Sequence, residues 1–159
     1  MKTYQGEIME IVKVNGSHKD FFYLSQKLEE FQFNLMPGLK EKGYSLTENL
    51  NDIVGYVLYD NDKPIGSIGL KKISDANCEI VRVYVCDEYR GKGYATILFE
   101  KIETLAINMG YKNAEMVAWS KSESAIRLYK KLGYDSTEEK DSEWFVGLKY
   151  IEFLKSLEN

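Results

Sequence analysis

The chain has 159 residues, of which 44% are hydrophobic and 29% are charged, and its formal net charge is −4 with a pI of about 5.2. This length fits one domain, residues 1–159, with a core of its own. The composition is typical of a globular protein, and the acidic balance gives no reason to expect a nucleic-acid partner.

Metal, disulfide and membrane features are not expected. His18 is the single histidine, so neither a His-ligated metal site nor a Ser-His-Asp triad is expected. Cys78 and Cys86 flank one predicted strand, which separates them by about 25 Å, too far for a disulfide. The N-terminus lacks the apolar region of a signal peptide, and no apolar run is long enough to span a membrane. We therefore expect a cytoplasmic protein with reduced cysteines, no metal and no membrane partner.

The first half of the chain predicts a strand, two helices and two further strands. Alternating apolar residues indicate the strands, and apolar residues three and four positions apart indicate the first helix. The predicted elements are a strand over 7–14, a helix capped by Ser17, a short helix over 37–42, and strands over 53–59 and 65–73 joined by a turn at 60–64.

The hydrophobic period changes sharply between Glu79 and Ile102. Residues 79–85 alternate like a strand, with Glu79 on the face of Val81, Val83 and Val85 and with Arg82 on the other face. A helical stripe begins at Tyr94. The intervening turn, Arg90-Gly91-Lys92-Gly93-Tyr94-Ala95, combines glycines and basic residues with a helix N-terminus. Such a turn favours a bound phosphate or pyrophosphate.

A glycine-rich turn is a weak signal by itself. The turn lacks the third glycine and the distal acidic residue of a dinucleotide-binding fingerprint. It also lacks the Lys that follows the last glycine of a phosphate-binding loop, because Tyr94 occupies that position. A strand–helix turn without any ligand therefore stays open from the turn alone.

The second half predicts a strand over 111–119, a helix that opens with a capping box of Ser120 and Glu123 and ends at Gly133, a charged loop, and a strand over 144–150. If the helix after Tyr94 is a crossover, strands 79–85 and 111–119 run parallel. The order β-α-α-β-β-β-α-β-α-β predicts an α+β fold with a mixed, mostly antiparallel sheet and a central parallel strand pair.

Two segments resemble the signatures of the GNAT acetyltransferase superfamily. Residues 90–95 fit its Arg/Gln-x-x-Gly-x-Gly/Ala loop, and residues 124–134, Ser-Ala-Ile-Arg-Leu-Tyr-Lys-Lys-Leu-Gly-Tyr, resemble its A-x-x-L-Y-x-x-x-G-F/Y motif. The resemblance spans residues 77–135 in the family's order and spacing. It implies a GNAT-like fold, acetyl-CoA as co-substrate, and N-acetyl transfer to a primary amine.

The resemblance also implies roles for individual residues. Tyr129 matches the tyrosine that protonates the departing thiolate, although a core aromatic is the alternative, and Ser122 stands where the family often has a CoA-contacting Asn. The backbone of Val83, Tyr84 and Val85 would pair with the pantetheine arm. The pyrophosphate would lie on the loop residues Arg90, Gly91, Lys92, Gly93, Tyr94, Ala95 and Thr96.

Glu79 is the candidate general base, because a carboxylate occupies a strand position where an apolar residue is expected; a water chain is the alternative. Phe22, Tyr23 and Phe33 lie off the stripe of the first helix and are weak candidates for acceptor contacts. The acceptor, a small-molecule or peptide amine, stays open among polyamine, aminoglycoside, amino acid and protein N-terminus. A non-catalytic acyl-CoA-binding or regulatory module of the same fold is the competing interpretation. The C-terminal strand is a candidate for pairing in a homodimer.

Overall fold

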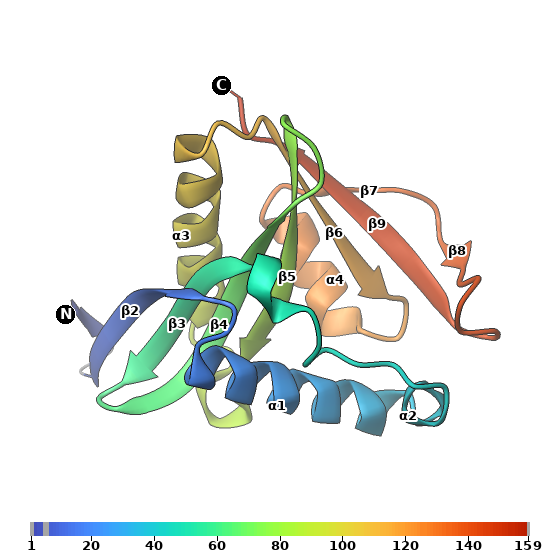
Figure 1. Cartoon of the computed structure of the whole chain (residues 1–159), viewed down its shortest axis with the longest axis horizontal. Coiled ribbons are helices and arrows are strands. Elements are labelled where there is room, and N and C mark those ends of the chain that lie inside the picture. Colours follow the sequence, from blue (N-terminus) through green and yellow to red (C-terminus); the bar gives the residue numbers. More distant parts are fainter. Residues whose placement is uncertain (1, 5–6, 159) are drawn as a thin grey trace.

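The computed structural model describes residues 2–4 and 7–158 and shows a twisted sheet with helices on both faces (Figure 1). The strands are β1 (Lys2–Tyr4), β2 (Glu7–Asn15), β3 (Val54–Asp60), β4 (Lys63–Lys72), β5 (Asn77–Val85), β6 (Asn113–Trp119), β7 (Asp135–Ser136), β8 (Lys140–Asp141) and β9 (Lys149–Ser156). The α-helices are α1 (Lys19–Leu35), α2 (Gly38–Glu41), α3 (Tyr94–Asn108) and α4 (Glu123–Lys131), with short 3₁₀ helices at Leu50–Asp52 and Asp87–Tyr89.

The described strands form one mixed sheet in the order β1-β2-β3-β4-β5-β6-β9-β7, with β8 paired to β9. The pair β5 and β6 is parallel, and α3 connects these two strands, whereas the other described pairs are antiparallel. This arrangement confirms the predicted fold class and the predicted central parallel pair. The short strands β1, β7 and β8 were not predicted.

Each face of the sheet has its own hydrophobic core. The larger core lies between the sheet and α3, and it includes Phe99, Ile102, Met116, Tyr129 and Phe153. The smaller core lies beneath α1, and its members include Phe21, Leu24, Ile53, Val57 and Cys86. Both cysteines are buried and unpaired.

The last strand lies later in the chain than the hydrophobic pattern predicts. The predicted strand at 144–150 is wrong, because Trp144 and Val146 are 87% and 78% exposed and Gly147 has a left-handed φ of 89°. The segment is therefore a turn, and the strand β9 occupies what was expected to be a tail. The described β9 pairs with β6 on one edge and with β7 and β8 on the other. A homodimer through this strand stays a prediction.

Two predicted helix caps are also wrong. Ser17 donates its N–H and its hydroxyl to Asn15 Oδ1, at 2.9 and 3.0 Å, so His18 takes the N-cap position of α1 and accepts from the Asp20 N–H at 3.1 Å. At α4, the N-cap is Ser122 and not Ser120. Among the described helices, none is both long and apolar enough to cross a membrane.

Candidate active site

The sheet opens where β5 and β6 separate. Their described pairing ends at Glu79 and Glu115, although β5 continues to Val85 and β6 to Trp119. The two strands diverge beyond this point in Figure 1. An interrupted ladder leaves backbone N–H and C=O groups without a neighbouring strand, and such groups can bind an extended ligand.

The register of β5 against β4 decides which backbone groups face this opening. Cys86 donates its N–H to the Ile65 carbonyl at 2.8 Å, and Tyr84 is paired with Ser67 on the same ladder. Because backbone groups alternate along a strand, Val83 and Val85 direct theirs away from β4 and toward β6. Of the three residues predicted to meet the pantetheine arm, Val83 and Val85 are thus oriented toward the opening, whereas the Tyr84 backbone pairs with β4.

A β-bulge in β5 changes the faces predicted for its side chains. On β4, Ser67 and Gly69 are two residues apart, whereas their partners on β5, Tyr84 and Val81, are three residues apart. The extra residue is Arg82, whose φ of 56° is left-handed. β-Bulges are over-represented next to active sites. The bulge puts Val83 into the α3 core and Tyr84 into the α1 core. The predicted common face of Glu79, Val81, Val83 and Val85 is therefore wrong.

The bulge also brings Arg82 to the side of Glu79, which corrects the expectation that it points to the other face. Both residues line a cavity of about 390 Å³ between β5, the segment 43–49 and Phe145. The Arg82 Nε donates to the Leu46 carbonyl at 2.9 Å, and the Ser67 hydroxyl donates to the Arg82 carbonyl at 2.9 Å. These two hydrogen bonds, one from the Arg82 side chain and one to its backbone carbonyl, stabilise the bulge.

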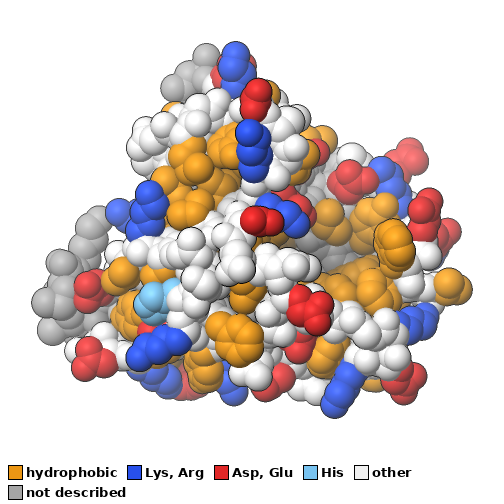
Figure 2. All heavy atoms as spheres, in the orientation of Figure 1, with side chains coloured by type: hydrophobic (Ala, Val, Ile, Leu, Met, Phe, Trp, Pro, Cys, Tyr) orange, Lys and Arg blue, Asp and Glu red, His pale blue; other side chains and the backbone are white. Residues whose placement is uncertain are grey.

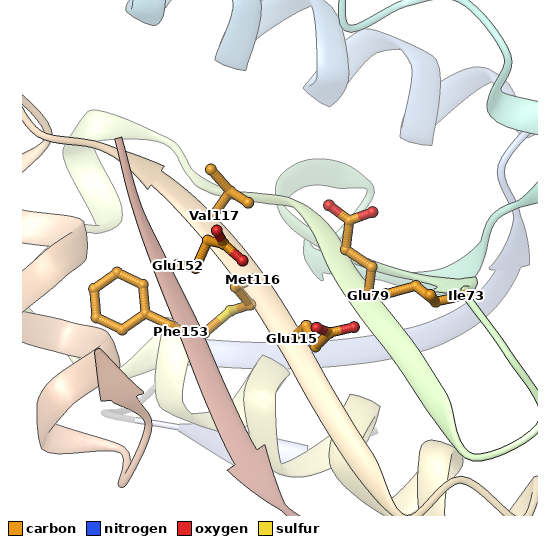
Figure 3. Close-up of a pocket in the computed structure, with 7 residues that line it drawn as sticks. All are labelled: Ile73, Glu79, Glu115, Met116, Val117, Glu152 and Phe153. Atoms are coloured by element: carbon orange, nitrogen blue, oxygen red, sulfur yellow. The ribbon is translucent and has the colours of Figure 1, made fainter. Parts of the chain in front are cut away.

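Glu79 lies at the point where β5 and β6 begin to separate. It is half-buried and lines the 390 Å³ cavity as well as a second cavity of about 210 Å³, in which Figure 3 shows Glu115 on β6 and Glu152 on β9. Burial raises the pKa of the Glu79 carboxyl above its ordinary value; Lys71 and Arg82 oppose this shift, and Glu115 adds to it. The side chain is therefore a stronger base than an exposed glutamate.

The turn before α3 has the geometry of an anion site. Gly91 and Gly93 have left-handed φ values of 76° and 87°, and α3 begins at Tyr94 without a side-chain cap or an acidic residue in its first turn. The N–H groups of Ala95 and Thr96 belong to this first turn, where backbone donors have no intrahelical partner. The helix dipole and these donors favour a bound phosphate.

Arg90 is engaged with protein groups around this turn. Its Nε donates to the Val85 carbonyl at 2.8 Å, and its Nη1 lies 2.6 Å from Asp87 Oδ1. The guanidinium carbon lies 4.6 Å from the ring centroid of Phe31 on α1 and 5.3 Å from that of Tyr84. The side chain therefore ties the turn to α1, in addition to supplying positive charge.

The other side chains of the turn differ in their environments. The Lys92 Nζ lies 5.7 Å from the Tyr89 ring centroid, and Tyr94 is 1% exposed in the core, so Tyr94 can contribute to a ligand site only through its backbone. Thr96 is half-buried in the first turn of α3.

Tyr129 and Ser122 both belong to the α4 region. Tyr129 is 8% exposed, and its ring packs edge-on against Phe153 at 5.4 Å and at a tilt against Phe99 at 5.7 Å. Burial raises its pKa to about 12, and its hydroxyl has no hydrogen bond to any described residue. The Ser122 hydroxyl makes no capping bond, although the Ser122 carbonyl accepts from the Ile126 N–H at 3.1 Å.

An aromatic cluster of Phe33, Tyr44, Trp119 and Phe145 closes the far side of the larger cavity. The Tyr44 ring centroid lies 6.5, 5.9 and 5.4 Å from those of Phe33, Trp119 and Phe145. The Lys42 Nζ donates to the Val146 carbonyl at 2.8 Å, which joins the α2 region to the loop before β9. On this face of the molecule, Figure 2 shows hydrophobic side chains gathered over β6, β9 and that loop.

The predicted acceptor contacts separate into two groups. Phe33 packs against Tyr44, which lines the larger cavity, whereas Phe22 and Tyr23 are 43% and 40% exposed and line neither cavity. Sequence reasoning missed Tyr44 and Phe145, because the segments that carry them have no recognisable motif. Within residues 2–4 and 7–158, no cluster of His, Cys, Asp and Glu could hold a metal ion.

Comparisons with known proteins agree with this geometry. The model of the Acetyltransferase (GNAT) family matches residues 21–134. An uncharacterized N-acetyltransferase from Methanocaldococcus jannaschii is 26% identical over 118 residues, and the match covers 74% of this chain but only 50% of that protein.

Solved structures share the fold along nearly the whole chain. A putative acyl-CoA N-acyltransferase from Klebsiella pneumoniae has a TM-score of 0.76 at 17% identity, covering 95% of this chain and 99% of the other. A GNAT family acetyltransferase from Elizabethkingia anophelis, solved with acetyl-CoA bound, has a TM-score of 0.67 at 15% identity, covering 93% and 97%.

Proposed function

The chain belongs to the GNAT acetyltransferase family, and we propose that it transfers the acetyl group of acetyl-CoA to a primary amine of a small molecule or peptide. One observation carries the proposal. The β5–β6 opening has a helix N-terminus suited to a pyrophosphate at one end, and a half-buried carboxylate, Glu79, between two cavities at the other. This arrangement suits a long phosphorylated carrier on one side of the sheet and an amine on the other.

Acetyl-CoA would be held mainly by backbone groups. The outward-facing N–H groups of Val83 and Val85 suit the amide-containing pantetheine arm, and the first turn of α3 after Gly93 suits the pyrophosphate. Because Arg90 is bound to Val85 and Asp87, we propose that it chiefly holds the turn in shape. Lys92 would supply positive charge near the phosphates. A relative of the same fold is solved with acetyl-CoA bound, which supports this choice of carrier.

Glu79 would remove the proton that prevents an ammonium group from attacking. A free amine is a minor species at neutral pH, because alkyl ammonium groups have a pKa of about 10.4. The raised pKa of Glu79 makes its carboxylate a better acceptor for this proton, directly or through a water molecule. The amine nitrogen then forms a bond to the acetyl carbon while the bond from that carbon to sulfur breaks, and the proton that the nitrogen loses on becoming an amide passes to the departing thiolate or to water.

Tyr129 would stabilise the departing thiolate by donating a hydrogen bond. Its pKa of about 12 keeps the phenol protonated throughout the working pH range. A thiol has a pKa of about 8.5, so complete transfer of the proton from Tyr129 to the thiolate is unfavourable. Donation without transfer therefore suits this residue, provided that its buried hydroxyl reaches the sulfur when the carrier is bound.

A non-catalytic acyl-CoA-binding module is the second candidate, and the core packing of Tyr129 favours it, because such a ring has a structural reason to be present. Two measurements separate the candidates: thiol release from acetyl-CoA against a panel of amines, and CoA binding by calorimetry. Binding with turnover on any amine supports the enzyme. Binding without turnover across the panel supports the module, and absence of CoA binding overturns both.

A further inference from the structure

Arg82 has donor capacity that the protein does not use. Its Nε bonds to the Leu46 carbonyl, but within the described part of the chain its guanidinium makes no ion pair and no second hydrogen bond. The residue is half-buried and lines the 390 Å³ cavity, so its remaining donors can serve a ligand there. A guanidinium offers a planar fork of N–H groups that matches a carboxylate.

The position of Arg82 is held at a conformational cost. A left-handed φ in a residue other than Gly is unfavourable by about 1–2 kcal/mol, and Arg82 has a φ of 56°. The hydrogen bond from the buried Ser67 to its carbonyl and the bond from its Nε to Leu46 stabilise this conformation. The same bulge brings the guanidinium to the cavity that Glu79 lines, so the strained residue and the candidate base share one site.

The walls of the cavity combine charges with apolar surface. Arg82 and Lys71 supply positive charge, and Glu79 and Glu48 supply negative charge. Tyr44, Ile53, Val81 and Phe145 supply an apolar wall. The volume lies within the range of about 300–1,000 Å³ that is common for small-molecule sites.

We propose that Arg82 binds a carboxylate of the acceptor, so that the acceptor is a small amine that also carries a carboxylate, as amino acids do. This inference rests on the proposed function. The ammonium group lies toward Glu79, and the carboxylate lies on the Arg82 guanidinium. The two side chains leave β5 three residues apart, the bulge at Arg82 brings both to the same cavity, and both are long enough to converge on one small molecule. The apolar wall receives the side chain of the acceptor.

The test compares amino acids with the amines that remain after loss of their carboxylate. Suitable pairs are phenylalanine with phenethylamine, leucine with isoamylamine, and lysine with cadaverine. The kcat/KM of each member is measured with the wild-type protein, R82Q and R82K. Since the amines of a pair differ in their own pKa, the readout is the change in the acid-to-amine ratio between proteins at one pH.

We expect the wild-type protein to prefer the carboxylated member of a pair, and R82Q to lower that ratio by about 10- to 100-fold, mainly through KM. R82K should keep part of the preference, because a lysine retains the charge but not the fork. K71Q is the matched control, since it removes a positive charge from the same cavity. It should lower the ratio much less than R82Q.

The inference fails if R82Q leaves the ratio unchanged, if K71Q lowers it equally, or if the wild-type protein acetylates amines but prefers those without a carboxylate. In the last case the acetyltransferase activity still stands. CoA binding by R82Q shows whether the fold survives, and R82K provides a second variant if it does not. No turnover with any amine would overturn the proposed function itself, and the inference with it.

Discussion

The Ser67 hydroxyl donates a 2.9 Å hydrogen bond to the backbone carbonyl of Arg82, at the one place where β5 has an extra residue against β4. Ser67 is fully buried. A carbonyl displaced from its ladder by a bulge needs another donor, because a buried polar group without a partner is costly. This serine therefore stabilises the bulge that places Arg82 beside Glu79.

Replacing Ser67 by Ala should destabilise the protein. The change removes the donor and leaves the Arg82 carbonyl unpaired, at a cost of about 1–3 kcal/mol. Urea unfolding measures the loss. S25A is the matched control: Ser25 is equally buried, but its hydroxyl has no partner among the described residues, so S25A should be neutral or stabilising. Equal destabilisation by both variants would contradict the role given to the Ser67 hydrogen bond.

Replacing Glu79 by Gln should lower kcat by about 10²- to 10⁴-fold, the range expected for loss of a general base. E115Q is the matched control, because Glu115 stands opposite Glu79 in the parallel register. E115Q removes a charge that raises the pKa of Glu79. Turnover should therefore persist, and the acid limb of the plot of kcat against pH should move to lower pH. An acid limb unaffected by E115Q would argue that Glu79 does not control it.

Replacing Glu79 by Gln should also raise the free energy of unfolding at neutral pH. Because the folded-state pKa of Glu79 is raised above its unfolded value, the folded protein binds the proton more tightly than the unfolded chain does. The contribution of Glu79 to the stability of the folded protein is therefore fully present below its unfolded-state pKa, and it is lost as the pH rises through its folded-state pKa. E79Q removes this dependence. Urea unfolding of wild-type protein and E79Q across pH 4–8 measures it, and a lower stability of E79Q at pH 7 would contradict the expectation.

The element order could be predicted from the sequence because hydrophobic period depends on local geometry. The strand over 79–85 was recognised by alternation and the helix after Tyr94 by apolar residues three and four positions apart, and both patterns can be read from the residues themselves. The last strand was misplaced because Trp144 and Val146 look like strand residues but lie exposed in a turn. Only the sheet as a whole decides which segment pairs with β6.

The candidate site was predictable only where a local motif marks it. Gly91 and Gly93 indicate the turn before α3 in the sequence, since they supply its left-handed φ values. The bulge at Arg82 has no such mark: it arises from the register between β4 and β5, and it reverses every face assigned from strict alternation beyond Val81. The cavity contacts of Tyr44 likewise depend on tertiary packing.

Replacing Tyr129 by Phe should separate catalysis from folding. The hydroxyl has no hydrogen bond to any described residue, so its loss should change stability little while both ring contacts persist. If Tyr129 donates to the thiolate, Y129F should bind CoA as tightly as the wild-type protein and lose about 10- to 100-fold in kcat. Calorimetry and steady-state kinetics measure the two effects. Unchanged kcat would leave Tyr129 with a structural role only.

Replacing Gly91 by Ala tests the turn before α3 through backbone geometry alone. An added Cβ would meet no atom within 4 Å, but Gly91 has a φ of 76°, a conformation that costs a residue with a side chain about 1–2 kcal/mol. We expect a corresponding loss of stability, and weaker CoA binding if the turn relaxes. G38A is the matched control, because Gly38 also has open space around it but lies in the helix α2 with no left-handed φ; there Ala should stabilise slightly. Calorimetric titration with CoA, together with urea unfolding of both variants, decides the matter: if G91A binds CoA and unfolds as G38A does, the left-handed turn is not needed for the site.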